Sequence, residues 1–159
     1  MNKKIHPLIL AILCMLLLSL TLSFAADKKP VAIKKSDKCP VCGMFVSGYK
    51  NWMSEIIFAD GTYAVFDGPK DMFRYYLNIK KYNPAKTASD ISRIYITEYY
   101  STEFTDAREV FFVQGSDVNG PMGAELVPIA SETAAKEFLK DHKGKKVLKF
   151  NEVTGETLK

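Results

Sequence analysis

The chain has 159 residues and a formal net charge of +4 at pH 7, and 47% of its residues are hydrophobic. This length suits one compact domain or two very small ones. A charge so close to neutrality gives no indication of a nucleic-acid partner or of binding to a charged membrane surface.

The N-terminal segment MNKKIHPLILAILCMLLLSLTLSFAAD (1–27) has the pattern of a secretory signal peptide. Lys3 and Lys4 form a basic start, an apolar run follows, and Ser23-Phe24-Ala25 is a small-x-small cleavage site. We expect cleavage after Ala25, which removes 1–25 and leaves a mature chain from Ala26 to Lys159 with a charge of +2 (4 minus the two lysines). Retention of the apolar run as a membrane anchor is the alternative.

Export predicts a periplasmic location and leaves two cysteines, Cys39 and Cys42, in the mature chain. The third, Cys14, lies in the apolar run after Leu13, whereas a lipoprotein signal places a small residue before its cysteine. Exported cysteines normally form disulfides, but a loop as short as CxxC removes little entropy from the unfolded chain. A purely stabilising disulfide is therefore the weaker interpretation of this pair.

Residues 26–38 include the basic stretch KKPVAIKKSDK and predict a flexible leader, because so few apolar residues cannot offset the entropy of ordering it. After this leader the chain contains an internal repeat. YAVFDGPKDMFRYYL (63–77) aligns without a gap on ELVPIASETAAKEFL (125–139). Each begins with a short apolar strand and continues into a helix, started by Pro69 in the first copy and Ser131 in the second.

The flanks of the two copies also agree. A β-rich run precedes each copy (54–59 and 109–114), and another follows each helix (93–100 and 146–153). The sequence therefore predicts an α+β fold of two tandem ββαβ units. Residues 39–105 hold the CxxC segment and the first unit, and residues 106–159 hold the second.

The two halves differ in their first hairpin. Asp60-Gly61-Thr62 is a tight turn, whereas GSDVNGPMGA (115–124) predicts a long loop in the second half. Long loops on a regular scaffold often carry function, and this one holds Met122 between glycines and a proline. The alternative is that Met122 fills the open edge of a small core, as methionine often does.

Cys39 and Cys42 permit several interpretations. A thioredoxin-like redox motif places its first cysteine at a helix N-terminus after a strand, but this motif follows a polar leader. A zinc site needs four ligands. The mature chain has one histidine, His142, which we expect at the surface near a helix C-terminus.

The remaining soft donors are Cys39, Cys42, Met44 and Met122. Thiolates and thioethers favour Cu(I), which accepts two or three ligands and can therefore stay open to a partner. On chemistry alone, a soft-metal site and a plain disulfide both remain open.

CPVCGMFV (39–46), GPMGAELVPIASETAAKEF (120–138) and HKGKKVLKFNEV (142–153) resemble the NosL family, exported copper proteins that accompany nitrous oxide reductase. The resemblance covers residues 37–155 and implies a pair of ββαβ units with a Cu(I) chaperone role in maturing that reductase's copper centres. Three ligands, Cys42, Met44 and Met122, match its motif positions, and Cys39 joins them as a further ligand. Many members are lipoproteins, which leaves membrane anchoring of this chain an open question.

We therefore expect an exported, non-enzymatic Cu(I) metallochaperone whose CxxCGM segment folds against the loop carrying Met122. Its expected partners are nitrous oxide reductase as copper acceptor and a membrane copper donor or an ABC-type maturation complex. The alternatives are a thiol–disulfide oxidoreductase acting through Cys39 and Cys42, and copper sequestration or sensing without delivery. An organomercury-cleaving enzyme is disfavoured, because no proton donor is apparent beside the thiols at the motif.

Overall fold

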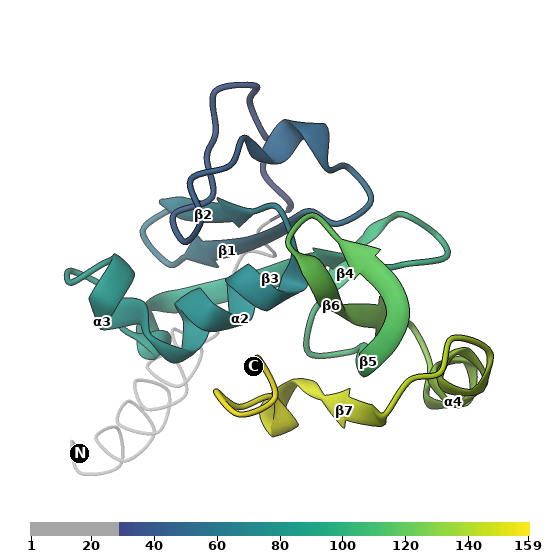
Figure 1. The fold of residues 1–159 in the computed structure, drawn as a ribbon. Coiled ribbons are helices and arrows are strands. Elements are labelled where there is room, and N and C mark those ends of the chain that lie inside the picture. Colours follow the sequence, from purple (N-terminus) through teal and green to yellow (C-terminus); the bar gives the residue numbers. More distant parts are fainter. Residues whose placement is uncertain (1–28) are drawn as a thin grey trace, which may run out of the picture.

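A computed structural model describes residues 29–159, so the predicted signal peptide and Cys14 lie outside the described residues. The strands form two antiparallel sheets (Figure 1). The first has the order β2-β1-β3-β4 and the second the order β6-β5-β7. The strands are β1 (Ser54–Phe58), β2 (Tyr63–Phe66), β3 (Ile91–Thr97), β4 (Phe104–Asp106), β5 (Phe111–Gly120), β6 (Gly123–Ile129) and β7 (Lys146–Lys149).

Three α-helices accompany the sheets: α2 (Pro69–Leu77), α3 (Ile79–Tyr82) and α4 (Glu132–Asp141). Short 3-10 helices span Val46–Gly48, Ala88–Asp90 and Phe150–Glu152. Proline at the first position starts α2, and the Ser131 side chain caps α4 by accepting a hydrogen bond from the backbone N–H of Ala134. Within residues 29–159 no helix is long and apolar enough to span a membrane.

The predicted pair of ββαβ units is confirmed. The first unit runs β1-β2-α2-β3 and the second β5-β6-α4-β7, and in both the first strand lies between the other two. One strand was not predicted: β4 extends the first sheet by pairing with β3 over three residues.

The predicted loop over residues 115–124 is wrong. β5 continues to Gly120 and β6 begins at Gly123, so that only Pro121 and Met122 lie between the two strands. The pairing shifts register between Gln114 and Asn119 and then resumes, with Asn119 opposite Ala124. This irregularity, next to the positive φ of Gly115, lets the hairpin continue as a long arm instead of ending in a loop.

The two units share one hydrophobic core. Phe73 of α2 packs edge-on against Phe112 of β5, and it also contacts Phe150, with ring centroids 5.0 Å apart in both pairs. Helix α2 contacts strands of both sheets (Figure 1). Helix α4 covers the second sheet through a smaller cluster of Val113, Val127, Ile129, Ala135 and Phe138. The larger core is therefore shared by the two units, and the second unit adds a smaller cluster of its own.

The leader differs from the prediction from Val31 onward. The Val31 N–H donates to both carboxyl oxygens of the buried Glu55, at 3.0 and 3.2 Å. Val31 and Ile33 also pack against the shared core. Residues 31–38 therefore lie along the first unit, instead of forming the free leader that their polar composition predicted.

Candidate metal site

The CxxCGM segment forms a closed turn. The Cys39 N–H donates to the Met44 carbonyl and the Gly43 N–H to the Cys39 carbonyl, both at 2.9 Å. A β-bridge between Lys38 and Phe45 closes the base of this turn. Gly43 has a φ of +81°, a backbone conformation that side chains disfavour, so glycine suits the tight return of the chain.

The turn brings both thiols against two carboxyl groups. Cys42 Sγ donates to Asp67 Oδ1 at 3.2 Å, and Cys39 Sγ lies 3.5 Å from Asp71 Oδ2. Asp67 lies between β2 and α2, and Asp71 lies in the first turn of α2. One ligand atom from each of the four residues lies within 4.8 Å of the others. We call Cys39, Cys42, Asp67 and Asp71 the cysteine–aspartate cluster.

Both cysteines are free thiols with raised pKa values. Burial raises the pKa of Cys39 far above its ordinary value, and the neighbouring Asp67 raises it further. Burial also raises the pKa of Cys42 to about 11. A thiol–disulfide oxidoreductase needs the opposite shift, since a lowered pKa supplies the attacking thiolate. The cluster therefore does not favour the oxidoreductase alternative.

Asp67 has one oxygen without a partner. Its side chain has no exposed surface, and Oδ2 makes no hydrogen bond to any residue in the part of the chain that the structure describes. A buried, unpaired carboxyl oxygen is unfavourable, and a bound cation would satisfy it. Thiolates suit Cu(I) and Zn²⁺, and carboxylates are also Zn²⁺ ligands. The residues present therefore fit a metal ion.

The structure brings some of the predicted ligands together directly. Cys39 and Cys42 share the cluster, and Met44 is half-buried in the same turn. Met122 lies at the tip of the β5–β6 hairpin with 45% of its surface exposed. The sequence also predicted that the segment carrying Met122 would fold against the CxxCGM segment. In the structure the hairpin tip lies close to Gly68, the residue after Asp67: a Cβ built on Gly68 would lie 3.7 Å from Pro121 Cδ.

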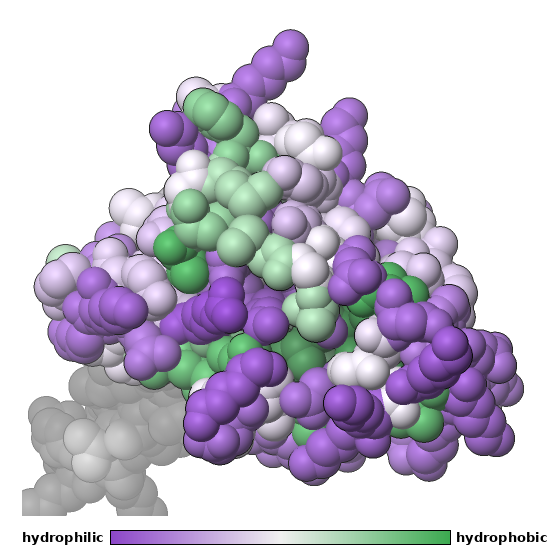
Figure 2. Space-filling model, viewed as in Figure 1, coloured by the Kyte–Doolittle hydropathy of each residue, from purple (hydrophilic) through white to green (hydrophobic). Residues whose placement is uncertain are grey.

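The cysteine turn and the Pro121–Met122 turn therefore flank the same short junction between β2 and α2. Figure 1 shows the tip of the β5–β6 hairpin beside the start of α2. Figure 2 shows an apolar patch on part of the upper loop, next to hydrophilic side chains, and the colours of Figure 1 place the segment with the CxxC motif in this loop. Within that loop Phe45 is 54% exposed. The assignments of Met44 and Met122 as ligands remain predictions.

Sequence reasoning missed the two carboxyl groups. It used Asp67 only as a helix start and gave Asp71 no role. The repeat itself contains the signal, because the equivalent positions of the second copy hold Ile129 and Thr133, so only the first copy is acidic there. The sequence argument against an organomercury-cleaving enzyme did not consider these two carboxyl groups, which accept hydrogen bonds from the thiols.

His142 lies where the sequence placed it, at the C-terminal end of α4. Its Nδ1 lies 3.1 Å from Asp117 Oδ1, and its ring stacks on Phe138. The cysteine–aspartate cluster does not include it, which agrees with a surface role.

Comparison with known proteins identifies the family to which the chain belongs. The family model described as NosL matches residues 30–158. A copper-binding lipoprotein NosL from Stutzerimonas stutzeri is 29% identical over 127 residues, which cover 79% of this chain and 66% of that protein. The crystal structure of the copper chaperone NosL from Shewanella denitrificans has a TM-score of 0.68 at 22% identity, covering 81% of this chain and 98% of that one, and it supports the fold alone. Because the family model spans most of its length, the chain belongs to the NosL family.

Proposed function

We propose that this protein is an exported Cu(I) carrier that delivers copper for the maturation of nitrous oxide reductase. The observation that carries the proposal is the pair of free thiols in the cysteine–aspartate cluster, because two cysteine sulfurs held together are soft donors that suit Cu(I). The name of the similar protein from Stutzerimonas stutzeri, a copper-binding lipoprotein, supports copper as the cargo. The apolar N-terminal segment supports export to the periplasm.

The proposed ligands are Cys42, Met44 and Met122, with Cys39 as a fourth sulfur. Cu(I) prefers such soft donors and tolerates low coordination numbers, which leaves room for a partner's ligands to attack the ion. Both thiols must lose their protons on binding, so their hydrogen bonds to Asp67 and Asp71 are given up as the metal enters. The two carboxyl groups thus hold the unloaded thiols close together, with one ligand atom from each of the four residues within 4.8 Å of the others.

Competition with a Cu(I) chelator under anaerobic conditions tests the ligand set. We expect Cys42→Ser and Met122→Leu each to lower the affinity roughly tenfold or more, since each removes one sulfur donor. Leucine is the matched substitution for methionine because it keeps the apolar volume and removes only the sulfur. An unchanged affinity in the Cys42→Ser, Met122→Leu double variant would refute the proposed site.

Zn²⁺ is the specific rival cargo, because the cluster contains two carboxyl groups beside the thiols. Asp67→Asn separates the two metals. A site built on sulfur should keep Cu(I) affinity within about threefold in this variant, whereas a Cys₂Asp₂ zinc site should lose Zn²⁺ binding. Preferential binding of Zn²⁺ over Cu(I) by the wild type, lost in Asp67→Asn, would overturn the proposal of a copper carrier.

Delivery requires an experiment of its own. The Cu(I)-loaded protein is mixed anaerobically with copper-free nitrous oxide reductase, and the copper content of each protein is measured after separation. Transfer at a rate above that from a small-molecule Cu(I) complex supports a carrier. Retention of the metal by the loaded protein supports sequestration or sensing instead. The proposed membrane donor or ABC-type maturation complex can be added to the same assay.

A further inference from the structure

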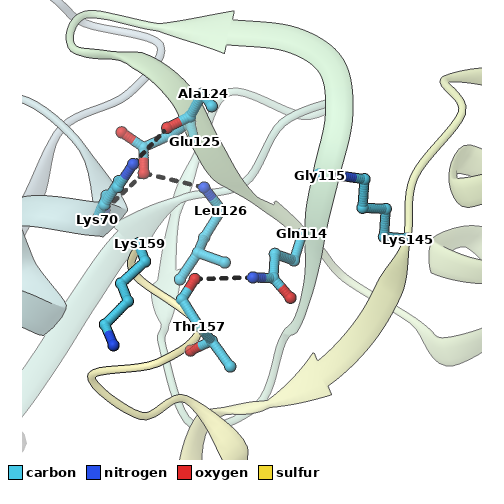
Figure 3. Close-up of a pocket in the computed structure, with 9 residues that line it drawn as sticks. All are labelled: Lys70, Gln114, Gly115, Ala124, Glu125, Leu126, Lys145, Thr157 and Lys159. Atoms are coloured by element: carbon cyan, nitrogen blue, oxygen red, sulfur yellow. Dashed lines mark hydrogen bonds between the residues drawn. The ribbon is translucent and has the colours of Figure 1, made fainter.

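A buried glutamate links the two units beside the proposed copper site. Glu125 of β6 is 4% exposed, and its Oε1 accepts hydrogen bonds from the backbone N–H groups of Lys70 at 2.6 Å and Leu126 at 2.9 Å. The Lys70 ammonium group in turn donates to the carbonyl of Ala124 at 3.2 Å. Figure 3 shows Lys70 and Glu125 facing each other across the junction between α2 and β6.

Glu125 supplies a hydrogen-bond acceptor that the residues at the start of α2 do not provide themselves. The N-cap residue of α2 is Gly68, which has no side chain and makes no side-chain cap. The first N–H groups of a helix have no partner within the helix, and Glu125 pairs one of them, that of Lys70. In the second unit Ser131 caps α4 from its own sequence. The first helix therefore depends on the second unit for its cap.

The same side chain fits between two glycines on opposite sides of the junction. A Cβ on Gly68 would lie 2.4 Å from Glu125 Oε2, and a Cβ on Gly120 would lie 2.9 Å from Glu125 Cγ. Gly68 directly follows Asp67 of the cysteine–aspartate cluster, and Gly120 directly precedes the Pro121–Met122 turn. Glu125 thus contacts both parts that have to meet around the metal.

We propose that Glu125 is a positioning residue that holds the Met122 turn beside the cysteine–aspartate cluster, so that Met122 contributes to copper affinity only when Glu125 is in place. This inference rests on the proposed function, because it assumes that Met122 binds the cargo. It adds a residue that touches no metal and acts through the placement of the hairpin tip.

A double-mutant cycle between Glu125 and Met122 tests the proposal. Glu125→Ala should lower Cu(I) affinity roughly 10–100-fold, as loss of a residue that orients a ligand typically does. In the Met122→Leu background the same change should lower it less than about twofold, because the ligand that Glu125 positions is already absent. Glu125→Gln keeps an acceptor for the Lys70 and Leu126 N–H groups and should retain most of the wild-type affinity.

A matched control separates positioning from general stability. Glu98 is also a buried carboxyl group that accepts backbone hydrogen bonds, from the N–H groups of Tyr100, Ser101 and Ala130 at 3.0, 2.7 and 3.2 Å. Glu98→Ala should therefore lower the urea midpoint of unfolding without changing Cu(I) affinity. Where Glu125→Ala does not fold, Glu125→Asp is the second variant, since it draws the carboxyl group back by one methylene.

A spectroscopic signature reports on Met122 itself. With ¹³C-labelled methionine methyl groups, Cu(I) should shift the Met122 and Met44 signals of the wild type. In Glu125→Ala, or Glu125→Asp, it should shift only that of Met44. A Met122 signal that still shifts fully in the Glu125 variants overturns the inference.

The inference and the proposed function fail in different ways. Wild-type affinity in Glu125→Ala, together with weak binding in Met122→Leu, overturns the positioning role and leaves the copper site standing. The positioning role is also overturned if the losses of Cu(I) affinity in Glu125→Ala and Met122→Leu simply multiply in the double variant, because the two residues then act independently. Wild-type affinity in Met122→Leu overturns the proposed ligand set and the inference with it.

Discussion

Replacing Gly68 with alanine should destabilise the protein through a contact between the two units. The Gly68 backbone is extended, with φ −160° and ψ 162°, so alanine can adopt it without backbone strain. The added methyl group, however, would lie 2.4 Å from Glu125 Oε2 and 3.3 Å from its Cδ. The penalty therefore comes from the side chain of Glu125, which has to move.

The magnitude follows from what that movement gives up. Overpacking a well-packed site typically costs about 1–3 kcal/mol. If Glu125 withdraws to relieve the overlap, the Lys70 N–H loses its carboxyl partner, and an unsatisfied buried donor costs about 1–3 kcal/mol. Because movement exchanges part of the first penalty for the second, we expect Gly68→Ala to lower the free energy of unfolding by roughly 2–4 kcal/mol.

Urea unfolding monitored by circular dichroism measures this change, with the m-value expected to stay constant. Gly48→Ala is the matched control, because a methyl group there meets no described atom within 4 Å. In the Glu125→Ala background, Gly68→Ala should have a smaller effect, since the clashing carboxyl group is gone. If Gly68→Ala were as mild as Gly48→Ala, the close packing of Glu125 against α2 would be refuted.

Three further predictions concern stability. Burial raises the pKa of Glu55 to about 7 and that of Glu125 to about 8, so the stability that these two groups contribute is fully present below the unfolded value of about 4.5 and is lost as pH rises through 7–8. The free energy of unfolding, measured by urea unfolding, should therefore differ between pH 5 and pH 8. Glu55→Gln, which keeps an acceptor for Val31, should reduce this difference by at most about 3 kcal/mol. An undiminished pH slope in that variant would exclude Glu55 as a source. Ser131→Ala removes the side-chain cap of α4 and should cost about 1 kcal/mol in urea unfolding, and no change would show that the cap is dispensable. Phe112→Ala should cost about 3–5 kcal/mol in the same assay because its ring lies in the core shared by both units, and a loss below about 1 kcal/mol would contradict that placement.

The repeated ββαβ architecture could be predicted because its signals are local. Apolar runs at strand spacing, Pro69 at the start of one helix and Ser131 at the start of the other are visible without knowledge of any distant contact. The short strand β4 was missed because it is three residues long and, among residues 29–159, pairs with β3 alone. Such a pairing depends on where the neighbouring strand lies and leaves little periodic signal.

The long hairpin and the carboxyl half of the site depend on tertiary structure. GSDVNGPMGA is rich in turn residues, yet pairing across a register shift after Gln114 makes most of it strand. Asp67 and Asp71 join Cys39 and Cys42 because the N-terminal segment packs against the start of α2, 25 and 32 residues away in the two hydrogen-bonded pairs. Motif spacing alone contains no information about that contact.

The two units differ at the junction between their second strand and their helix: the second unit stabilises its helix locally, and the first holds the proposed metal site there. In the second unit, the position equivalent to Asp67 is Ile129, which packs under α4, and Ser131 caps that helix locally. In the first unit the same junction holds acidic side chains and an uncapped glycine, features that weaken a helix start on its own. Glu125 of the second unit replaces the missing cap, and the hairpin that carries it also carries Met122. The weak local start of α2 is thus offset by a contact from the second unit, which makes the proposed metal site a property of the assembled pair.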